Sequence, residues 1–171
     1  MLGVFTAGLL LGGALSATVL WLASGLVTPV PEGWRAPAAI GVALLGVARD
    51  AGLIALRLPQ NARQVPQDVL QRDLVRGALQ FGFELGTGVR TYVSASLPYA
   101  AAVAVLLAND AGAALLTGVG FALGRAATPA LRFASGTGEE WDDRLLDRLT
   151  LLSVGGGTAL ACALTLLALR G

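Results

Sequence analysis

Most of the polar side chains that could do chemistry in this chain lie inside long apolar runs. A charge near the centre of a bilayer costs about 2.5–3.5 kcal/mol on insertion scales, so such a residue must be paired, hydrated or close to the interface. Intramembrane ionisable residues commonly mark substrate or ion pathways. We therefore predict a substrate-binding site, with no catalytic residue and no metal ligand. Its expected members are Arg49, Asp50, Gln80, Glu84, Gly86, Gly88, Arg90, Tyr92 and Arg125.

The charges in this set do not balance, because three arginines face two carboxylates. Either one arginine extends to the interface, or the interior holds an anion, which a guanidinium fork binds well. Structural ion pairing that holds the helices together is the alternative. Arg49 and Asp50 are neighbours in sequence and point about 100° apart on a helix. We expect them not to form an ideal pair with each other, and each to have a second partner.

The composition predicts that these residues are held by membrane helices. Of 171 residues, 55% are hydrophobic and 13% are charged, and the mean hydropathy is +0.70, whereas soluble domains carry about 25% charged residues. The chain has no His and one Cys, so we expect no zinc site, no His-ligated haem, no internal disulfide and no cofactor. A net charge of +1 gives no reason to expect nucleic acid as a partner.

We predict one all-α transmembrane domain over residues 1–171, with about six spans and both termini inside. The arginine-rich stretch 57–76 is expected on the cytoplasmic side. All twelve basic residues are Arg, and Ala, Leu and Gly are abundant, which suggests a high-GC bacterial genome, so we expect a multi-pass protein of the bacterial inner membrane. A short interfacial helix is expected at 139–147. The predicted spans cover residues 2–27, 36–58, 76–93, 98–108, 111–133 and 149–169.

The stretch 76–108 is too long for one straight span and is interrupted by Gly86, Gly88 and Pro98. We expect a helix to about residue 93, a turn at 94–98 and a short return helix at 98–108. A single kinked span is the alternative, which would give five spans and reverse the sidedness of residues 109–171. Broken helices at membrane depth line cavities in transporters, where they bind substrates.

Two small-xxx-small patterns, Gly8-xxx-Gly12 and Gly82-xxx-Gly86, stand about 75 residues apart. Such patterns let neighbouring helices approach closely. Their spacing suggests an internal repeat, although chance matches in glycine-rich apolar sequence explain it equally well.

The segments 63–66 (RQVP) and 77–92 (GALQFGFELGTGVRTY) resemble parts of small polytopic membrane proteins of actinobacteria. More distantly, the architecture is similar to the CcdA/DsbD-like thiol electron carriers of cytochrome c biogenesis and to LysE/TauE-type exporters. The thiol carriers use two membrane cysteines beside prolines. Here no cysteine is near Pro98 and Cys162 stands alone, which argues against thiol electron transfer unless Cys162 pairs with another chain.

From these observations we expect a small-solute transporter or permease, with an anion as one candidate solute. The alternative is a non-catalytic subunit or assembly factor of a larger membrane complex, and an intramembrane enzyme ranks third. The expected partners are the lipid bilayer and either further copies of the chain or other membrane subunits.

Overall fold

A computed structural model of the chain describes residues 1–58, 74–88, 95–136 and 138–170. The regular structure in these residues is entirely helical, as the sequence predicts. Its elements are α1 (Leu2–Ser24), the 3-10 turn η1 (Gly25–Val27), α2 (Glu32–Asp50), α4 (Leu74–Thr87), α5 (Leu97–Ala108), α6 (Ala111–Ser135) and α7 (Gly138–Ala168).

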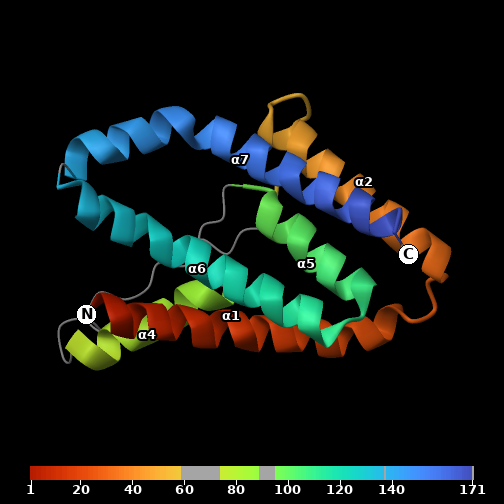
Figure 1. Cartoon of the computed structure of the whole chain (residues 1–171), viewed down its shortest axis with the longest axis horizontal. Helices are drawn as coiled ribbons and strands as arrows, with labels where there is room; N and C mark the ends of the chain where they lie inside the picture. The colour runs from red at the N-terminus through yellow and green to blue at the C-terminus, as the bar shows by residue number, and fades with distance from the viewer. Residues whose placement is uncertain (59–73, 89–94, 137, 171) are drawn as a thin grey trace.

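The helices form two groups that share α5 (Figure 1). In one group, α1 packs against α4 and α6, and in the other, α2 packs against α7. Helix α5 lies between the groups and contacts α1, α2, α6 and α7. The position of α5 therefore depends on both groups.

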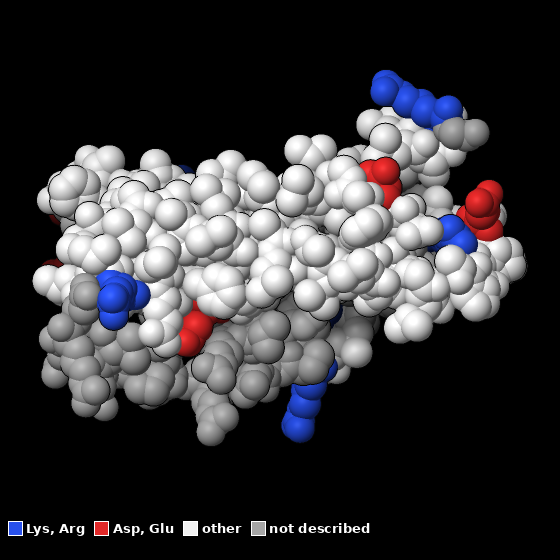
Figure 2. All heavy atoms as spheres, turned by 90° about the horizontal axis from the view of Figure 1, so that it is seen from below, with Lys and Arg blue, Asp and Glu red and all other residues white. Residues whose placement is uncertain are grey.

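Small residues fill the interior and large apolar residues face outward. The buried hydrophobic residues are mainly alanines, whereas Leu22, Leu116 and Phe133 are 66%, 76% and 87% exposed. A soluble domain would bury these large side chains, but helices in lipid pack through small residues and present large ones to hydrocarbon. Figure 2 shows a broad uncharged expanse on one face, with charged side chains at its margins.

Three helical segments are long and apolar enough to cross a membrane: Leu2–Val27, Ala111–Ser135 and Gly138–Ala168. The described residues therefore give three candidate spans, where the sequence predicts about six. Helices α4 and α5 have 14 and 12 residues, or about 21 and 18 Å at 1.5 Å per residue, and each is shorter than a hydrocarbon layer of about 30 Å. Helix α2 carries Glu32, Arg35, Arg49 and Asp50, which lower its hydropathy.

The closest helix contact joins α1 to α4 through the two small-xxx-small patterns. A Cβ atom on Gly8 or Gly12 would overlap the backbone of Leu79 or Phe83 in α4. A Cβ on Gly82 or Gly86 would likewise overlap the backbone of α1. The two patterns pack against each other, so this contact accounts for their presence without a duplication.

A hydrogen bond fixes how α5 runs relative to α1. Ser24 is fully buried at the end of α1. Its hydroxyl donates a hydrogen bond to Oδ1 of Asn109 at 2.6 Å. Asn109 is the C-cap residue of α5 and has a left-handed backbone conformation. The end of α1 and the turn between α5 and α6 therefore lie at the same end of the bundle. A return helix would place them at opposite ends, so the structure matches the kinked-span alternative: α4 and α5 run in the same general direction, with a break between them (Figure 1).

Three helix boundaries differ from the prediction. Helix α2 ends at Asp50 instead of residue 58, and Gly52 follows with a φ of +77°. Helix α4 ends at Thr87, before Gly88 with a φ of +69°, while the predicted end at residue 93 lies outside the described residues. Helix α7 is one continuous helix of 31 residues, whereas the sequence predicts a separate interfacial helix at 139–147. The polar first part of α7 suits the membrane interface and its apolar second part suits hydrocarbon, but the residues of both parts favour helix.

Candidate functional site at the helix break

The break between α4 and α5 leaves two helix ends inside the bundle, and each end needs polar partners. The first N–H groups of α5 and the last C=O groups of α4 have no partner within their own helices. In lipid such groups must be satisfied by protein or by a water-filled cavity. The side chains that satisfy them define the candidate site.

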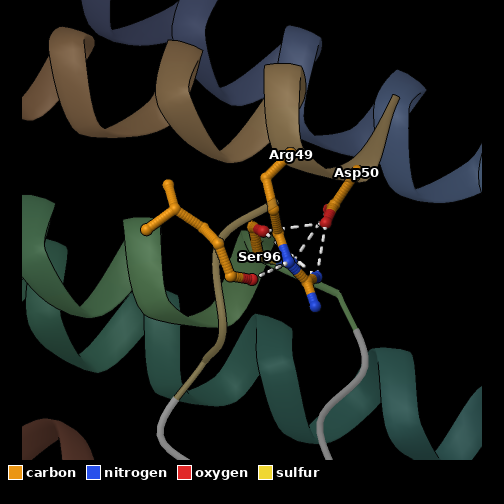
Figure 3. Close-up of polar contacts among 4 residues, drawn as sticks. Arg49, Asp50 and Ser96 are labelled. Atoms are coloured by element: carbon orange, nitrogen blue, oxygen red, sulfur yellow. Dashed lines mark hydrogen bonds and ion pairs between the residues drawn. The ribbon is translucent and has the colours of Figure 1, made fainter. Parts of the chain in front are cut away.

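Asp50 caps the start of α5. Its Oδ2 accepts a hydrogen bond from the backbone N–H of Ser96 at 2.8 Å, and its Oδ1 accepts one from the Ser96 hydroxyl at 2.7 Å (Figure 3). Ser96 is the N-cap residue of α5 and its own side chain makes no cap hydrogen bond. The Asp50 side chain is 4% exposed. A carboxylate at a helix N-terminus also interacts favourably with the helix dipole.

Arg49 neutralises this carboxylate. Its Nη1 lies 2.8 Å from Oδ1 of Asp50 (Figure 3). Its Nε donates to the carbonyl of Leu56 at 3.1 Å. The expectation that these neighbours would not pair well is therefore wrong, because both residues stand at the end of α2, where the arginine can fold back. The expected second partners are present: Ser96 for Asp50 and Leu56 for Arg49.

Arg125 and Ser16 donate hydrogen bonds to carbonyl groups at the end of α4, on the other side of the break. Nη1 of Arg125 donates to the carbonyl of Leu85 at 2.8 Å, and the Ser16 hydroxyl donates to the carbonyl of Thr87 at 3.0 Å. Both carbonyls belong to the last turn of α4. The Arg125 guanidinium also lies 5.2 Å from the ring centre of Phe121, a cation–π contact. A cation at the carbonyl end of a helix has the favourable sign for the dipole.

The charges predicted to form one site thus contact two different helix ends. Arg49 and Asp50 meet the start of α5, and Arg125 meets the end of α4. Gln80 donates to Oε1 of Glu84 at 3.1 Å on the surface of α4, as their spacing predicts. The Asp50 and Arg125 contacts cap helix ends. The Arg49–Asp50 pair is a structural ion pair of the kind considered as the alternative for the charge set.

The remaining predicted site residues divide into two groups. Gly86 contacts the backbone of Leu9 and so belongs to the α1–α4 packing, while Gly88 provides the left-handed turn that ends α4. Arg90 and Tyr92 lie outside the described residues.

Two serines that complete the site were not predicted from sequence. Ser96 stands directly before Leu97-Pro98, and a serine followed by an early proline is a helix N-terminus signal that could have identified it. No local signal identifies Ser16, because its partner Thr87 is 71 residues away.

Two hollows adjoin the break. One, with a volume of about 470 Å³, is lined mainly by apolar residues of α1, α5 and α6 and by the end of α4. The other, of about 430 Å³, is more polar. It is lined by Arg49, Asp50, residues 54–56 and, from α7, Leu149, Thr150 and Ser153.

Within the described residues, no three His, Cys, Asp or Glu side chains come together in a way that could hold a metal ion. Cys162 is a free, exposed thiol on α7. A disulfide within the chain is impossible with one cysteine.

Comparison with known proteins identifies a relative that matches most of the chain. The chain is 32% identical over 163 residues to the methylamine utilization protein MauF of Methylorubrum extorquens, a match that covers 90% of the chain and 57% of MauF. The chain therefore spans little more than half the length of that relative. No protein-family model matches the sequence, and no solved structure matches the fold.

Proposed function

We propose that the chain is a non-catalytic membrane protein, a subunit or assembly factor, that supports the use of methylamine by a bacterium. The observation that carries the proposal is that Arg49, Asp50 and Arg125 bind the helix ends of their own chain. Charged residues that bind helix ends stabilise the interrupted helix formed by α4 and α5. Each of them has hydrogen-bond partners within the chain.

The apolar hollow at the break supports the same interpretation. An anion carrier needs a cation or several donors aimed into its binding cavity. The described residues that line this hollow include no Arg, Asp or Glu. Such walls do not favour a small anion.

The similarity to MauF is the reason for proposing a role in methylamine use. MauF is described as a methylamine utilization protein, and the match runs along nearly the whole of this chain. Because the chain spans 57% of MauF, we extend to it only participation in methylamine use. The proposed role as a subunit or assembly factor rests on the contacts of Arg49, Asp50 and Arg125 with helix ends.

We further propose that the chain crosses the bacterial cytoplasmic membrane five times, through α1, α2, the α4–α5 pair, α6 and α7. Together α4 and α5 hold 26 residues, about 39 Å of helix, which is enough for one crossing. The Ser24–Asn109 contact supports this path, because it brings the end of α1 to the end of α5.

A small-solute permease is the second candidate. It is favoured by the more polar hollow beside Arg49. The Arg49 side chain is 21% exposed, and Thr150 and Ser153 belong to the same lining. An anion entering this hollow would meet a guanidinium and hydroxyl donors, which are suitable ligands for it.

Gene deletion followed by growth on methylamine tests the first proposal. The deletion strain is expected to fail with methylamine as the only carbon or nitrogen source, and to grow normally with succinate and ammonium. The wild-type gene should restore growth. Normal growth of the deletion strain on methylamine would contradict the proposal.

Reconstitution separates the two candidates. The purified chain in proteoliposomes is expected to move no labelled methylammonium, chloride, sulfate or phosphate. Flux of any of these that falls with Arg49→Ala but is unchanged with Arg144→Ala, an exposed arginine of α7, would favour the permease.

A further inference from the structure

The apolar hollow at the break is a candidate binding site that the proposed role does not use. It lies where α4 ends and α5 begins, against α1 and α6. Its lining includes Thr87 at the end of α4, Gly88 directly after it, Pro98 and Ala102 from α5, and Phe121 from α6. Small side chains leave its volume of about 470 Å³ unfilled by the described residues.

The hydroxyl groups of two lining residues already have partners. The Ser16 hydroxyl donates to the Thr87 carbonyl at 3.0 Å, and the Thr87 hydroxyl donates to the Glu84 carbonyl at 2.8 Å. An ordered water usually needs two to four polar partners. Walls of this kind therefore favour an apolar occupant over water or an ion.

The hollow is continuous with the outer face of α1. Leu15 and Val19 line it and are also 49% and 56% exposed. Both belong to Leu2–Val27, one of the three segments suited to crossing a membrane. The mouth of the hollow therefore opens toward the hydrocarbon that surrounds this segment.

We propose that one acyl chain of a membrane phospholipid enters this hollow and packs between α1 and α5 at the helix break. Wall atoms beside empty space lose their dispersion contacts, and an apolar cavity of about 150 Å³ is already large enough to bind benzene. The hollow is about three times that size and requires no polar group from its ligand. A flexible alkyl chain connected to the bilayer meets both conditions.

Photocrosslinking tests this proposal in the full chain. The probe is a phosphatidylcholine that carries a diazirine in the middle of one acyl chain, mixed into vesicles containing the protein. Light is expected to attach it to peptides that hold Ala102, Phe121 and Leu15. Ala102→Phe should lower this labelling roughly tenfold by filling the hollow, as expected for the loss of one ligand chain's buried contacts.

A matched variant shows whether the loss is specific. Ala108→Phe places the same side chain on an exposed position of α5 and should leave the labelling unchanged. If Ala102→Phe does not fold, Ala101→Val fills part of the same hollow and should reduce labelling to a smaller extent.

Three results would overturn the proposal. The first is an absence of label in the wall peptides, and the second is equal labelling of the wild type and a folded hollow-filling variant. The third is labelling by an isoprenoid diazirine probe without labelling by the acyl probe, which would assign the hollow to another class of ligand.

Discussion

The carboxylate of Asp50, the last residue of α2, accepts two hydrogen bonds from Ser96, the N-cap residue of α5, at 2.7 and 2.8 Å. The two residues are 46 positions apart in the sequence. Through this contact, the end of one helix fixes where another helix starts.

Removing this carboxylate should destabilise the protein strongly. Asp50→Ala leaves the Ser96 donors and the Arg49 charge without their buried acceptor, at a cost of about 3 kcal/mol in the free energy of unfolding. Asp50→Asn keeps one acceptor and should cost about half as much. Denaturant titration in detergent micelles measures both.

Asp110→Ala is the control for that experiment. Asp110 caps α6 by accepting from the N–H of Ala113 at 2.6 Å, but at an exposed position. Its loss should cost about 1 kcal/mol. Equal effects of Asp50→Ala and Asp110→Ala would contradict the central role of the buried cap.

A methyl group at the α1–α4 contact should be poorly tolerated. In Gly12→Ala, the new Cβ would overlap the Phe83 carbonyl and lie 2.8 Å from the Thr87 nitrogen. We expect a loss of about 1–3 kcal/mol from overpacking. Gly120→Ala adds the same methyl into open space on α6 and should be neutral or slightly stabilising, since alanine favours helix. Thermal unfolding of the two variants compares them, and a stable Gly12→Ala would refute the close contact.

Arg125 is expected to contribute more than an exposed arginine. Arg125→Met leaves the Leu85 carbonyl without its 2.8 Å donor and removes the contact with Phe121, which should cost about 1–3 kcal/mol. Arg144→Met breaks a 3.2 Å pair with Glu140 that is 70% and 67% exposed, so it should cost at most a few tenths of a kcal/mol. If both variants unfold at the same denaturant concentration, the capping role of Arg125 is wrong.

The continuity of α7 can be tested with proline. Arg148 is exposed in the middle of the helix, at the boundary where the sequence predicts two separate segments. Arg148→Pro should cost about 3 kcal/mol if one helix passes through this position. Glu139→Pro, in the first turn, should be tolerated. A harmless Arg148→Pro would restore the prediction of a separate interfacial helix.

Cysteine labelling tests the number of crossings. In a Cys162→Ser background, Thr28→Cys and Asp143→Cys place single thiols at exposed positions after α1 and near the start of α7. With α4 and α5 forming one crossing, a membrane-impermeant maleimide should reach these thiols from opposite sides of the membrane. Labelling of both from one side would instead fit six spans.

The sequence by itself determined the helical class, because hydropathy and helix period are local properties. The runs 2–27 and 111–133 predicted α1 and α6 closely, and the Asn109-Asp110 turn lies where the sequence placed it. Glycine and proline near 86–98 correctly indicated an interrupted helix, since they weaken helix wherever they occur. Gln80 and Glu84 meet as their spacing of four requires.

Only the tertiary structure decided what the interior charges contact. The Asp50–Ser96 and Arg125–Leu85 hydrogen bonds join residues 46 and 40 positions apart, and no local pattern encodes such pairs. The direction of α5 was likewise undetermined, because a broken helix can continue or reverse with the same local sequence. Ser24 and Asn109 settle that direction through a contact between the end of α1 and the end of α5, which exists only once the helices are packed.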